Sequence, residues 1–329
     1  MNLRHQLSLN ENFAPLLPGV REALEWSIDD SNLTLDALAS GLSGRIAESL
    51  DVAPENVVAG AGSAALLQQF VSAHAGPGDE VVHPWPSFEM YPLLARNCGA
   101  EAVAVPLRGY DQDLEAIAAA ITDRTRIVLL CNPNNPTGSL VEQAELESFL
   151  DNIPDHVLVL VDEAYREFAD PGTLAEALDL SRTDERVAVV RTFSKSHGLL
   201  GLRVGYLVAA PSVTAPLRTT VPFFRVGTAA QAAALAAIEA DEVMRRQCAD
   251  VARERERTRE ALLGLGWEVP PSAGNFLWLP LGERNDSFVD FLAERGVAVR
   301  AIAGAGVRVT IGPPEANDAV IMLAKEFGG

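Results

Sequence analysis

The sequence predicts an α/β protein whose larger part is a mostly parallel, doubly wound sheet. Between residues 55 and 210, short apolar runs alternate with segments of helical periodicity, which is the pattern of strands joined by crossover helices. Residues 157–161 form a continuous apolar run, as expected of a strand buried on both faces. With 329 residues, 48% of them hydrophobic, the chain is long enough to bury this core and a second, smaller one.

The N-terminal residues are predicted to form an extended arm followed by helices. Pro15 and Pro18 interrupt an irregular stretch, and a helix is expected from about residue 20 to residue 26. Residues 41–50 are predicted to be helical as well, and residues 57–59 to form a short strand. We expect the arm to complete the smaller C-terminal domain.

A glycine-rich turn joins this short strand to the next helix. Gly60, Gly62 and Ser63 precede apolar residues at helical spacing, so free backbone N–H groups and a hydroxyl stand at a helix N-terminus. Such a turn can hold an anion, most often a phosphate. Many helix N-termini share this composition and bind nothing, so the turn indicates an anion site only in combination with other motifs.

Three of the following strands lead into polar residues. Asn135 lies in the turn-rich loop after one apolar run, Asp162 directly follows another, and Lys195 follows a third. The strands are predicted at residues 80–82, 102–105, 127–131, 157–161, 187–190 and 204–208. Ligands of a doubly wound sheet bind outside the carboxyl ends of its strands. We therefore expect Ser63, Asn135, Asp162 and Lys195 to converge on one crevice.

Lys195 is one of only two lysines in the chain, the other being Lys325. Arginine is abundant, so the ordinary surface cations of this protein are arginines. A lysine, unlike an arginine, can lose its proton when it is desolvated and then attack a carbonyl carbon to form a Schiff base. Taken alone, Lys195 beside Ser194 also fits an ordinary lysine at the end of a strand.

The part beyond residue 210 is predicted to be a smaller α+β domain. Long helices are expected at residues 229–240 and 241–263, a shorter one at 287–295, and strands at 276–279, 297–299 and 307–311. We divide the chain into residues 1–30, an arm that joins the small domain, residues 31–225, the large domain, and residues 226–329, the small C-terminal domain.

Composition excludes several classes of function. The formal charge of −19 and the pI near 4.6 leave no basic surface for nucleic acid. Three cysteines and five histidines show no metal-ligand spacing, so we expect no metal site. The N-terminus lacks an apolar leader, and no apolar run reaches the roughly eighteen residues of a membrane span. We expect a cytoplasmic protein that binds neither nucleic acid nor membrane.

Four motifs follow one another in a fixed order: residues 132–138, residues 162–165, Ser194-Lys195 with residues 201–205, and Arg308. Together they resemble the pyridoxal-phosphate-dependent aminotransferases of the aspartate aminotransferase fold, most closely the histidinol-phosphate aminotransferase branch. The resemblance covers nearly the whole chain. It implies fold type I, with a seven-stranded-type sheet in a large domain that binds pyridoxal 5′-phosphate, and a homodimer with shared active sites.

The resemblance implies that five residues contact the cofactor ring. Among them, Lys195, Asp162 and Tyr165 are the expected catalytic residues. Lys195 matches the lysine that binds the cofactor as a Schiff base and later moves the substrate Cα proton. Asp162 matches the carboxylate that keeps the pyridine nitrogen protonated, which makes the ring a better electron sink. Tyr165 and Asn135 match the partners of the ring oxygen O3′, and Phe88 matches the aromatic ring stacked on the pyridine.

The cofactor phosphate and the substrate are assigned to the remaining matches. The phosphate cup corresponds to Gly62, Ser63, the backbone N–H of Ala64, Ser194 and Arg203. Arg308 matches the arginine that binds the substrate α-carboxylate through two parallel hydrogen bonds. Arg300, Arg225 and Asn12 are further candidates for substrate contacts, although the two arginines fit structural ion pairs equally well.

The sequence departs from the branch at positions that shape the substrate pocket. Residues 32–36 stand where the branch carries an Arg-Tyr-Pro segment whose tyrosine reaches the partner's cofactor phosphate, and Thr34 has a shorter reach. Ala64 and Ala65 replace two acidic residues, and Arg225 replaces a small polar residue or a histidine. These changes spare the residues expected to carry the cofactor chemistry, but they do not indicate which substrate the protein binds.

Three functions fit these observations. The leading one is an aminotransferase of amino-acid biosynthesis that moves an amino group between an amino acid or amine and a 2-oxo acid, with glutamate and 2-oxoglutarate as one pair. Its other substrate is histidinol phosphate or, alternatively, an aromatic amino acid such as phenylalanine. A second reading is a lyase, such as a decarboxylase of a phosphorylated amino acid. A third is a non-catalytic binding protein on the same scaffold.

Overall fold

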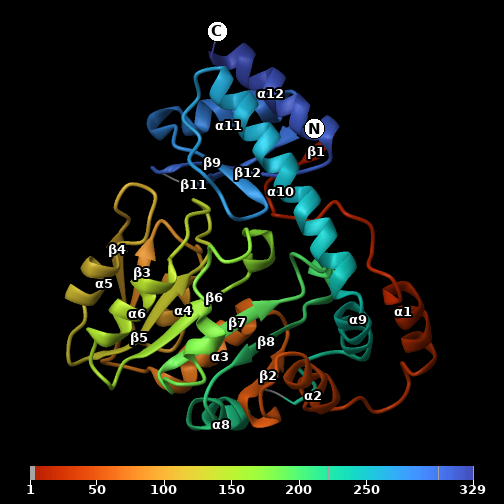
Figure 1. Cartoon of the computed structure of the whole chain (residues 1–329), viewed down its shortest axis with the longest axis vertical. Helices are drawn as coiled ribbons and strands as arrows, with labels where there is room; N and C mark the ends of the chain where they lie inside the picture. Colours follow the sequence, from red (N-terminus) through yellow and green to blue (C-terminus); the bar gives the residue numbers. More distant parts are fainter. Residues whose placement is uncertain (1–3, 221–222, 303, 329) are drawn as a thin grey trace.

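The computed structural model describes residues 4–220, 223–302 and 304–328. The lower part in Figure 1 is a large sheet covered by helices. The upper part is a small sheet with helices α11 (Asn285–Glu294) and α12 (Pro314–Gly328), and both chain ends lie there. The long helix α10 (Asp241–Gly264) runs between the two parts.

The large sheet has seven strands in the order β2-β8-β7-β6-β5-β3-β4. The four pairings from β7 to β4 are parallel, whereas β8 is antiparallel to both of its neighbours. This confirms the predicted mostly parallel sheet. The strands are Val57–Gly60 (β2), Glu80–Trp85 (β3), Glu101–Pro106 (β4), Thr125–Cys131 (β5), Leu158–Asp162 (β6), Val187–Thr192 (β7) and Gly205–Val208 (β8).

Helices cover both faces of this sheet because successive side chains of a strand point to opposite sides. Along β7, Ala188 and Val190 pack in one core with α3 and α8, whereas Val187 and Val189 pack in another core with α6. The helices of this part are Ser40–Ser49 (α2), Ser63–His74 (α3), Tyr91–Asn97 (α4), Leu114–Ala119 (α5), Gln143–Asp151 (α6), Ala177–Leu180 (α7) and Pro211–Thr220 (α8). The doubly wound arrangement predicted from the sequence is therefore present.

The upper part combines segments from both ends of the chain. β1 (His5–Gln6) pairs in parallel with β10 (Val297–Ala298), so this segment of the arm lies in the upper part. β11 (Arg300–Ile302), β12 (Gly306–Thr310) and β9 (Phe276–Leu279) form an antiparallel sheet in that order. Helix α1 (Val20–Asp29) packs against α9 (Thr228–Glu239), close to the lower end of α10.

Short elements are where the sequence prediction and the structure differ. β11 was not predicted, because three residues show no periodicity of their own and the strand exists through its hydrogen bonds to β12. The strand predicted at residues 297–299 ends at Ala298, and the first helix continues past residue 26 to Asp29. Single 3-10 turns lie at Pro54–Asn56 (η1), Arg166–Phe168 (η2), Leu200–Leu202 (η3) and Gly282–Arg284 (η4).

Candidate active site

The carboxyl ends of the central strands bring the predicted residues to one edge of the large sheet. Asp162 ends β6, and Lys195 follows β7. Gly60 of β2 pairs with Gly205 of β8, and Gly205 pairs with Thr192 of β7. This row across three strands places the glycine-rich turn before α3 beside the loop that carries Lys195.

The Lys195 side chain extends from this edge to the N-terminal arm. Its amino group donates hydrogen bonds to the backbone oxygens of Leu9 (3.2 Å) and Asn10 (3.0 Å). Burial lowers the pKa of Lys195 to about 7, and the nearby guanidinium groups of Arg308 and Arg203 add to this shift. An amine with this pKa is partly unprotonated at neutral pH and can attack a carbonyl carbon.

Asp162 is a buried carboxylate that, within the described residues, forms no ion pair. It accepts hydrogen bonds from the Tyr91 hydroxyl (3.3 Å) and the Ala164 N–H (3.2 Å). Burial raises the pKa of Asp162 to about 7, and the neighbouring Glu163 carboxylate contributes to the rise. The site thus holds an acid without a cation, and a protonated ring nitrogen is a cation that would fit it.

Tyr165 is fixed by Asn10 of the arm, a contact that the sequence did not predict. The Asn10 amide donates to the Tyr165 hydroxyl (2.9 Å), and the Thr310 hydroxyl donates to the Asn10 side-chain oxygen (3.0 Å). Asn10 is buried and has a φ of 51°, a left-handed conformation that asparagine tolerates. Burial raises the pKa of Tyr165 to about 12 although Arg308 opposes the shift, so the phenol keeps its proton and can donate it in a hydrogen bond.

The turn before α3 is packed closely enough to form an anion cradle. Gly62 has a φ of 85°, and a Cβ atom there would lie 2.5 Å from Nη2 of Arg203. A Cβ atom on Gly205 would lie 2.9 Å from the backbone nitrogen of Ser63. Arg203 also donates to the Ser194 hydroxyl (3.2 Å). A guanidinium, a hydroxyl and a helix N-terminus therefore meet here, as a phosphate requires.

Arg308 reaches the same site from β12 of the upper part. Its guanidinium donates to the side-chain oxygen of Asn135 (2.5 Å) and to the backbone oxygen of Ser8 (2.7 Å). Its Nε is buried and has no partner among the described residues. A buried guanidinium with an unsatisfied N–H can donate two parallel hydrogen bonds to a carboxylate ligand.

The other proposed substrate residues already have partners in this structure. Arg300 lies opposite Arg308 in the β11–β12 pair and binds both oxygens of Glu89 at 2.9 Å. Arg225 donates to two backbone oxygens, one of them of Leu38 (2.9 Å). The Arg300 ion pair is the structural alternative that the sequence analysis left open, whereas Arg225 forms no ion pair within the described residues and its Nη1 is buried without a partner there.

Asn12 and Phe88 support the site from its margins. The Asn12 amide donates to the backbone oxygens of Lys195 (2.9 Å) and Ser196 (3.2 Å), so it holds the loop rather than presenting a free amide. Phe88 is half-buried, and its ring meets the Tyr91 ring edge-on with centroids 5.6 Å apart.

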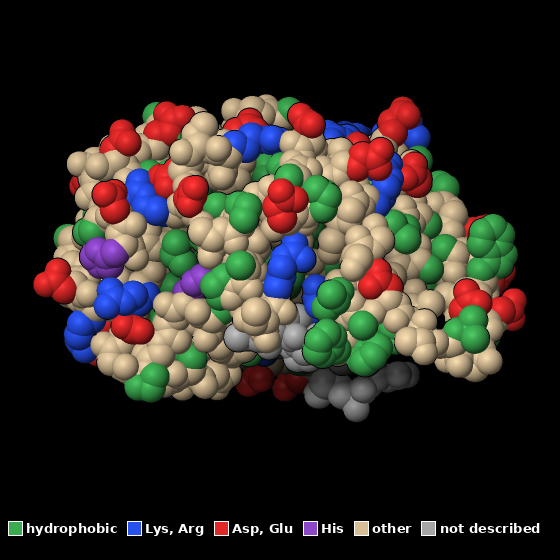
Figure 2. All heavy atoms as spheres, turned by 90° about the horizontal axis from the view of Figure 1, so that it is seen from below, with side chains coloured by type: hydrophobic (Ala, Val, Ile, Leu, Met, Phe, Trp, Pro, Cys, Tyr) green, Lys and Arg blue, Asp and Glu red, His purple; other side chains and the backbone are tan. Residues whose placement is uncertain are grey.

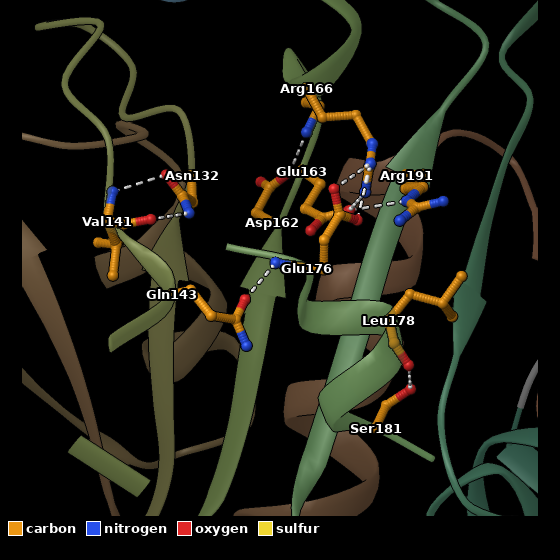
Figure 3. A network of polar contacts seen from close by, with 11 residues as sticks. Asn132, Val141, Gln143, Asp162, Glu163, Arg166, Glu176, Leu178, Ser181 and Arg191 are labelled. Atoms are coloured by element: carbon orange, nitrogen blue, oxygen red, sulfur yellow. Dashed lines mark hydrogen bonds and ion pairs between the residues drawn. The ribbon is translucent and has the colours of Figure 1, made fainter. Parts of the chain in front are cut away.

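A second acid lies beside Asp162 in a different setting (Figure 3). The Glu163 carboxylate binds Arg191 (2.7 Å) and Arg166 (2.9 Å), and Arg166 also reaches Glu176 (3.1 Å). The Glu163 side chain is fully buried. Its charge is balanced by two cations, unlike that of Asp162.

Two site residues were missed by the sequence analysis as members of the site. Asn10 was expected only as part of the N-terminal arm, whereas its buried side chain contacts Tyr165 of the site. Tyr91 follows Phe88 by three residues and carries no pattern that distinguishes it from a core tyrosine. Within the described residues, no group of three or more His, Cys, Asp or Glu side chains could hold a metal ion.

Comparison with known proteins agrees with the family resemblance noted in the sequence. Residues 10–322 match the family of class I and II aminotransferases. The chain is 48% identical over 323 residues to an aromatic amino acid aminotransferase of Thermobifida fusca (strain YX), a match that covers 98% of this chain and 90% of the relative. It is 44% identical over 324 residues to a Streptomyces coelicolor protein of the same name, with the same coverage.

A solved structure shares the whole fold. The histidinol-phosphate aminotransferase of Sinorhizobium meliloti, in complex with pyridoxal 5′-phosphate, superposes with a TM-score of 0.93 at 26% identity, covering 99% of this chain and 91% of that one. The resemblance seen in the sequence motifs therefore extends to the backbone.

Proposed function

We propose a substrate for this chain, which belongs to the class I and II aminotransferases and uses pyridoxal 5′-phosphate: it transfers the amino group of an aromatic amino acid to a 2-oxo acid such as 2-oxoglutarate. The observation that carries this proposal is the 48% identity, over 98% of the chain, to a protein named aromatic amino acid aminotransferase. It supports the aromatic alternative better than histidinol phosphate, which rests on a solved structure at 26% identity.

The residues present fit the cofactor, which supplies the electron sink for the carbanion at the substrate Cα. In this proposal Lys195 takes the proton from that carbon and returns it, because its lowered pKa lets the amine both accept and release a proton near neutral pH. Asp162 would balance the charge of the ring nitrogen, and Tyr165 and Asn135 would donate to the ring oxygen. Arg308 orients the substrate α-carboxylate.

Phosphate binding is assigned to the cradle at α3. Ser63 and Ser194 supply hydroxyls, Arg203 a guanidinium, and Gly62 and Ala64 the backbone of the turn. A side chain at residue 62 would be strained, because its φ of 85° is a conformation that L residues rarely adopt, and a Cβ atom would displace the end of the Arg203 side chain.

We also propose that two copies of the chain associate. Large apolar side chains are exposed on one face, and Figure 2 shows such side chains grouped there. Phe223 is 70% exposed and Phe224 56%, and the Phe224 N–H donates to the oxygen of Ala37, beside the half-exposed Leu38. Residue 34, where the family's bridging tyrosine is missing, belongs to the same segment. A second copy would cover these side chains.

Location in the cytoplasm remains a proposal. Among the described residues, no helix is long and apolar enough to cross a membrane. The cysteines Cys98, Cys131 and Cys248 are all unpaired, which fits a reducing compartment.

A donor competition tests the substrate. Purified holoenzyme would be assayed with phenylalanine, tyrosine, tryptophan and histidinol phosphate, each with 2-oxoglutarate, and kcat/KM compared. We expect an aromatic donor to exceed histidinol phosphate by roughly tenfold or more, the discrimination of one to a few kcal/mol that a shaped pocket supplies. Equal or greater efficiency with histidinol phosphate would reverse the assignment.

A further inference from the structure

A cavity of about 590 Å³ lies behind the loop that carries Lys195. Its walls are the first half of α10, helix α2, residues 166–174 after β6, and strands β7 and β8. Phe193 and His197 line it from the loop, whereas Lys195 between them bonds to the arm. The loop therefore separates this cavity from the active site. Its volume lies within the range of small-molecule sites, about 300–1,000 Å³.

The cations on the wall of the cavity are already neutralised. Four arginines line it, and each bonds to a carboxylate: Arg45 to Glu239, Arg166 and Arg191 to Glu163, and Arg245 to Asp241. Figure 3 shows the inner pair, Arg166 and Arg191, bound to Glu163. The cavity therefore has no surplus positive charge with which to hold an anion.

Glu167 is an acid of the wall that has no such partner. In the stretches that the structure describes, no Lys, Arg or His nitrogen lies within 4.0 Å of its carboxyl group, and the other unpaired acid, Asp170, is exposed at the rim. Burial raises the pKa of Glu167 although Arg191 and Arg166 oppose the shift. His197 adds no charge, because burial lowers its pKa to about 4. An incoming cation would stabilise the Glu167 carboxylate.

Aromatic rings line the same cavity as this acid. Phe168 follows it in the chain, and Phe193 and Tyr206 line the cavity with ring centroids 5.7 Å apart. Aromatic faces attract organic ammonium groups. We propose that the cavity binds a small organic ammonium compound, with its cationic head at Glu167 and its apolar body against Phe193, Tyr206 and Met244.

An occupant of this cavity would touch the back of the catalytic loop. The Ser196 hydroxyl lies 2.9 Å from Nδ1 of His197. The Ser196 backbone oxygen accepts from the Asn12 amide, which also donates to the backbone oxygen of Lys195. A ligand that packs on His197 and Phe193 therefore contacts the segment that positions the Lys195 amine. Binding changes turnover at saturating amino donor rather than competing with the donor.

Benzyltrimethylammonium is a suitable probe. It is a permanent cation without N–H groups, so it cannot form a Schiff base with the cofactor, and it has no carboxylate for Arg308. Calorimetric titration of the holoenzyme should show one saturable site per chain. Glu167→Gln should weaken binding roughly tenfold or more, and Ala249→Phe, on an exposed position of α10 that lines the cavity, should abolish it.

Glu283→Gln, which removes an exposed carboxylate on η4, serves as the matched control and should bind the probe like the original chain. Unchanged affinity in Glu167→Gln, or no saturable heat with a holoenzyme that turns over normally, would overturn the proposal. So would an effect on turnover that a higher concentration of amino donor removes, because the probe would then lie in the active site.

Discussion

Asp162 and Glu163 are neighbours in the chain but belong to two different electrostatic regions. Asp162 faces the edge where Lys195, Tyr165 and the phosphate cradle meet, and no cation balances it among the described residues. Glu163 lies between Arg166 and Arg191 in a closed set of ion pairs (Figure 3). Burying a charge without a partner is costly, whereas a paired buried charge is a structural element. Asp162, the unpaired acid, is therefore the one that we expect to bind a ligand.

The largest effect expected from this comparison is on catalysis at Asp162. Asp162→Asn removes the charge opposite the cofactor ring but keeps the size and the hydrogen-bonding shape of the side chain. We expect kcat to fall by roughly 10²–10⁴-fold, the range for a positioned charge or proton-transfer group. The free energy of unfolding of the apoprotein should not fall, because the variant no longer buries an unpaired carboxyl. A large loss of stability with normal kcat would contradict the functional assignment.

The opposite result is expected at Glu163. Glu163→Gln leaves Arg191 buried without its carboxylate, so the free energy of unfolding should fall by about 3–5 kcal/mol, measured by urea denaturation. Turnover per folded molecule should change far less than in Asp162→Asn. Glu176→Gln is the matched control: Glu176 is half-exposed, pairs with the same Arg166, and should cost at most about 1 kcal/mol. Equal losses in the two variants would contradict the distinction between the regions.

These two acids also show how far the sequence could be interpreted. The apolar run before Asp162 predicted a buried strand. The position of Asp162 at the end of that strand led us to expect this residue in the binding crevice. The sequence did not show that Glu163, one residue later, turns to Arg191, nor that the Tyr91 hydroxyl reaches Asp162 from 71 residues away. Such contacts depend on how strands and helices pack, which periodicity does not encode.

Residues brought in by other parts of the chain were the least predictable. Asn10 reaches Tyr165 across 155 residues, and Glu89 pairs with Arg300 across 211. Lys195 and Asn135 lie shortly after the ends of β7 and β5, and Arg203 lies in the connection between β7 and β8, so the sheet topology fixes where these connections begin. The cavity behind the loop had no signature in the sequence, since its walls come from five separate segments.

A smaller effect should appear in the pH dependence of the apoprotein's stability. The pKa of Asp162 rises from 3.8 to about 7 on folding, so unfolding releases a proton between these values and stability decreases as pH rises through this window. The pKa of Lys195 falls from 10.5 to about 7, so unfolding takes up a proton above pH 7 and stability increases with pH there. Asp162→Asn should remove the first trend and Lys195→Met the second.

Urea denaturation at a series of pH values, with cofactor removed, measures both trends. If Asp162→Asn keeps the decrease below pH 7, that decrease arises from other groups and the unpaired state of Asp162 is not its cause.

The smallest effect is expected at Tyr91, which supports Asp162 without touching the substrate. Tyr91→Phe removes one hydrogen bond to the carboxylate, so the pKa of Asp162 should rise further. We expect kcat to fall by roughly tenfold or less, the equivalent of about 1 kcal/mol for one hydrogen bond. The window in which apoprotein stability falls with pH should extend to higher pH. Tyr110→Phe, which removes the hydroxyl that binds Glu268, should change neither quantity.

The most direct test of the account is the absorbance spectrum of the protein with pyridoxal 5′-phosphate, recorded before and after phenylalanine is added. We predict a band from lysine-bound cofactor that is absent in Lys195→Ala and that phenylalanine converts, in proportion to the protein, to the spectrum of the aminated cofactor. A protein that shows no such band with excess cofactor, or whose band persists in Lys195→Ala, would contradict the assignment of this edge of the sheet as the active site.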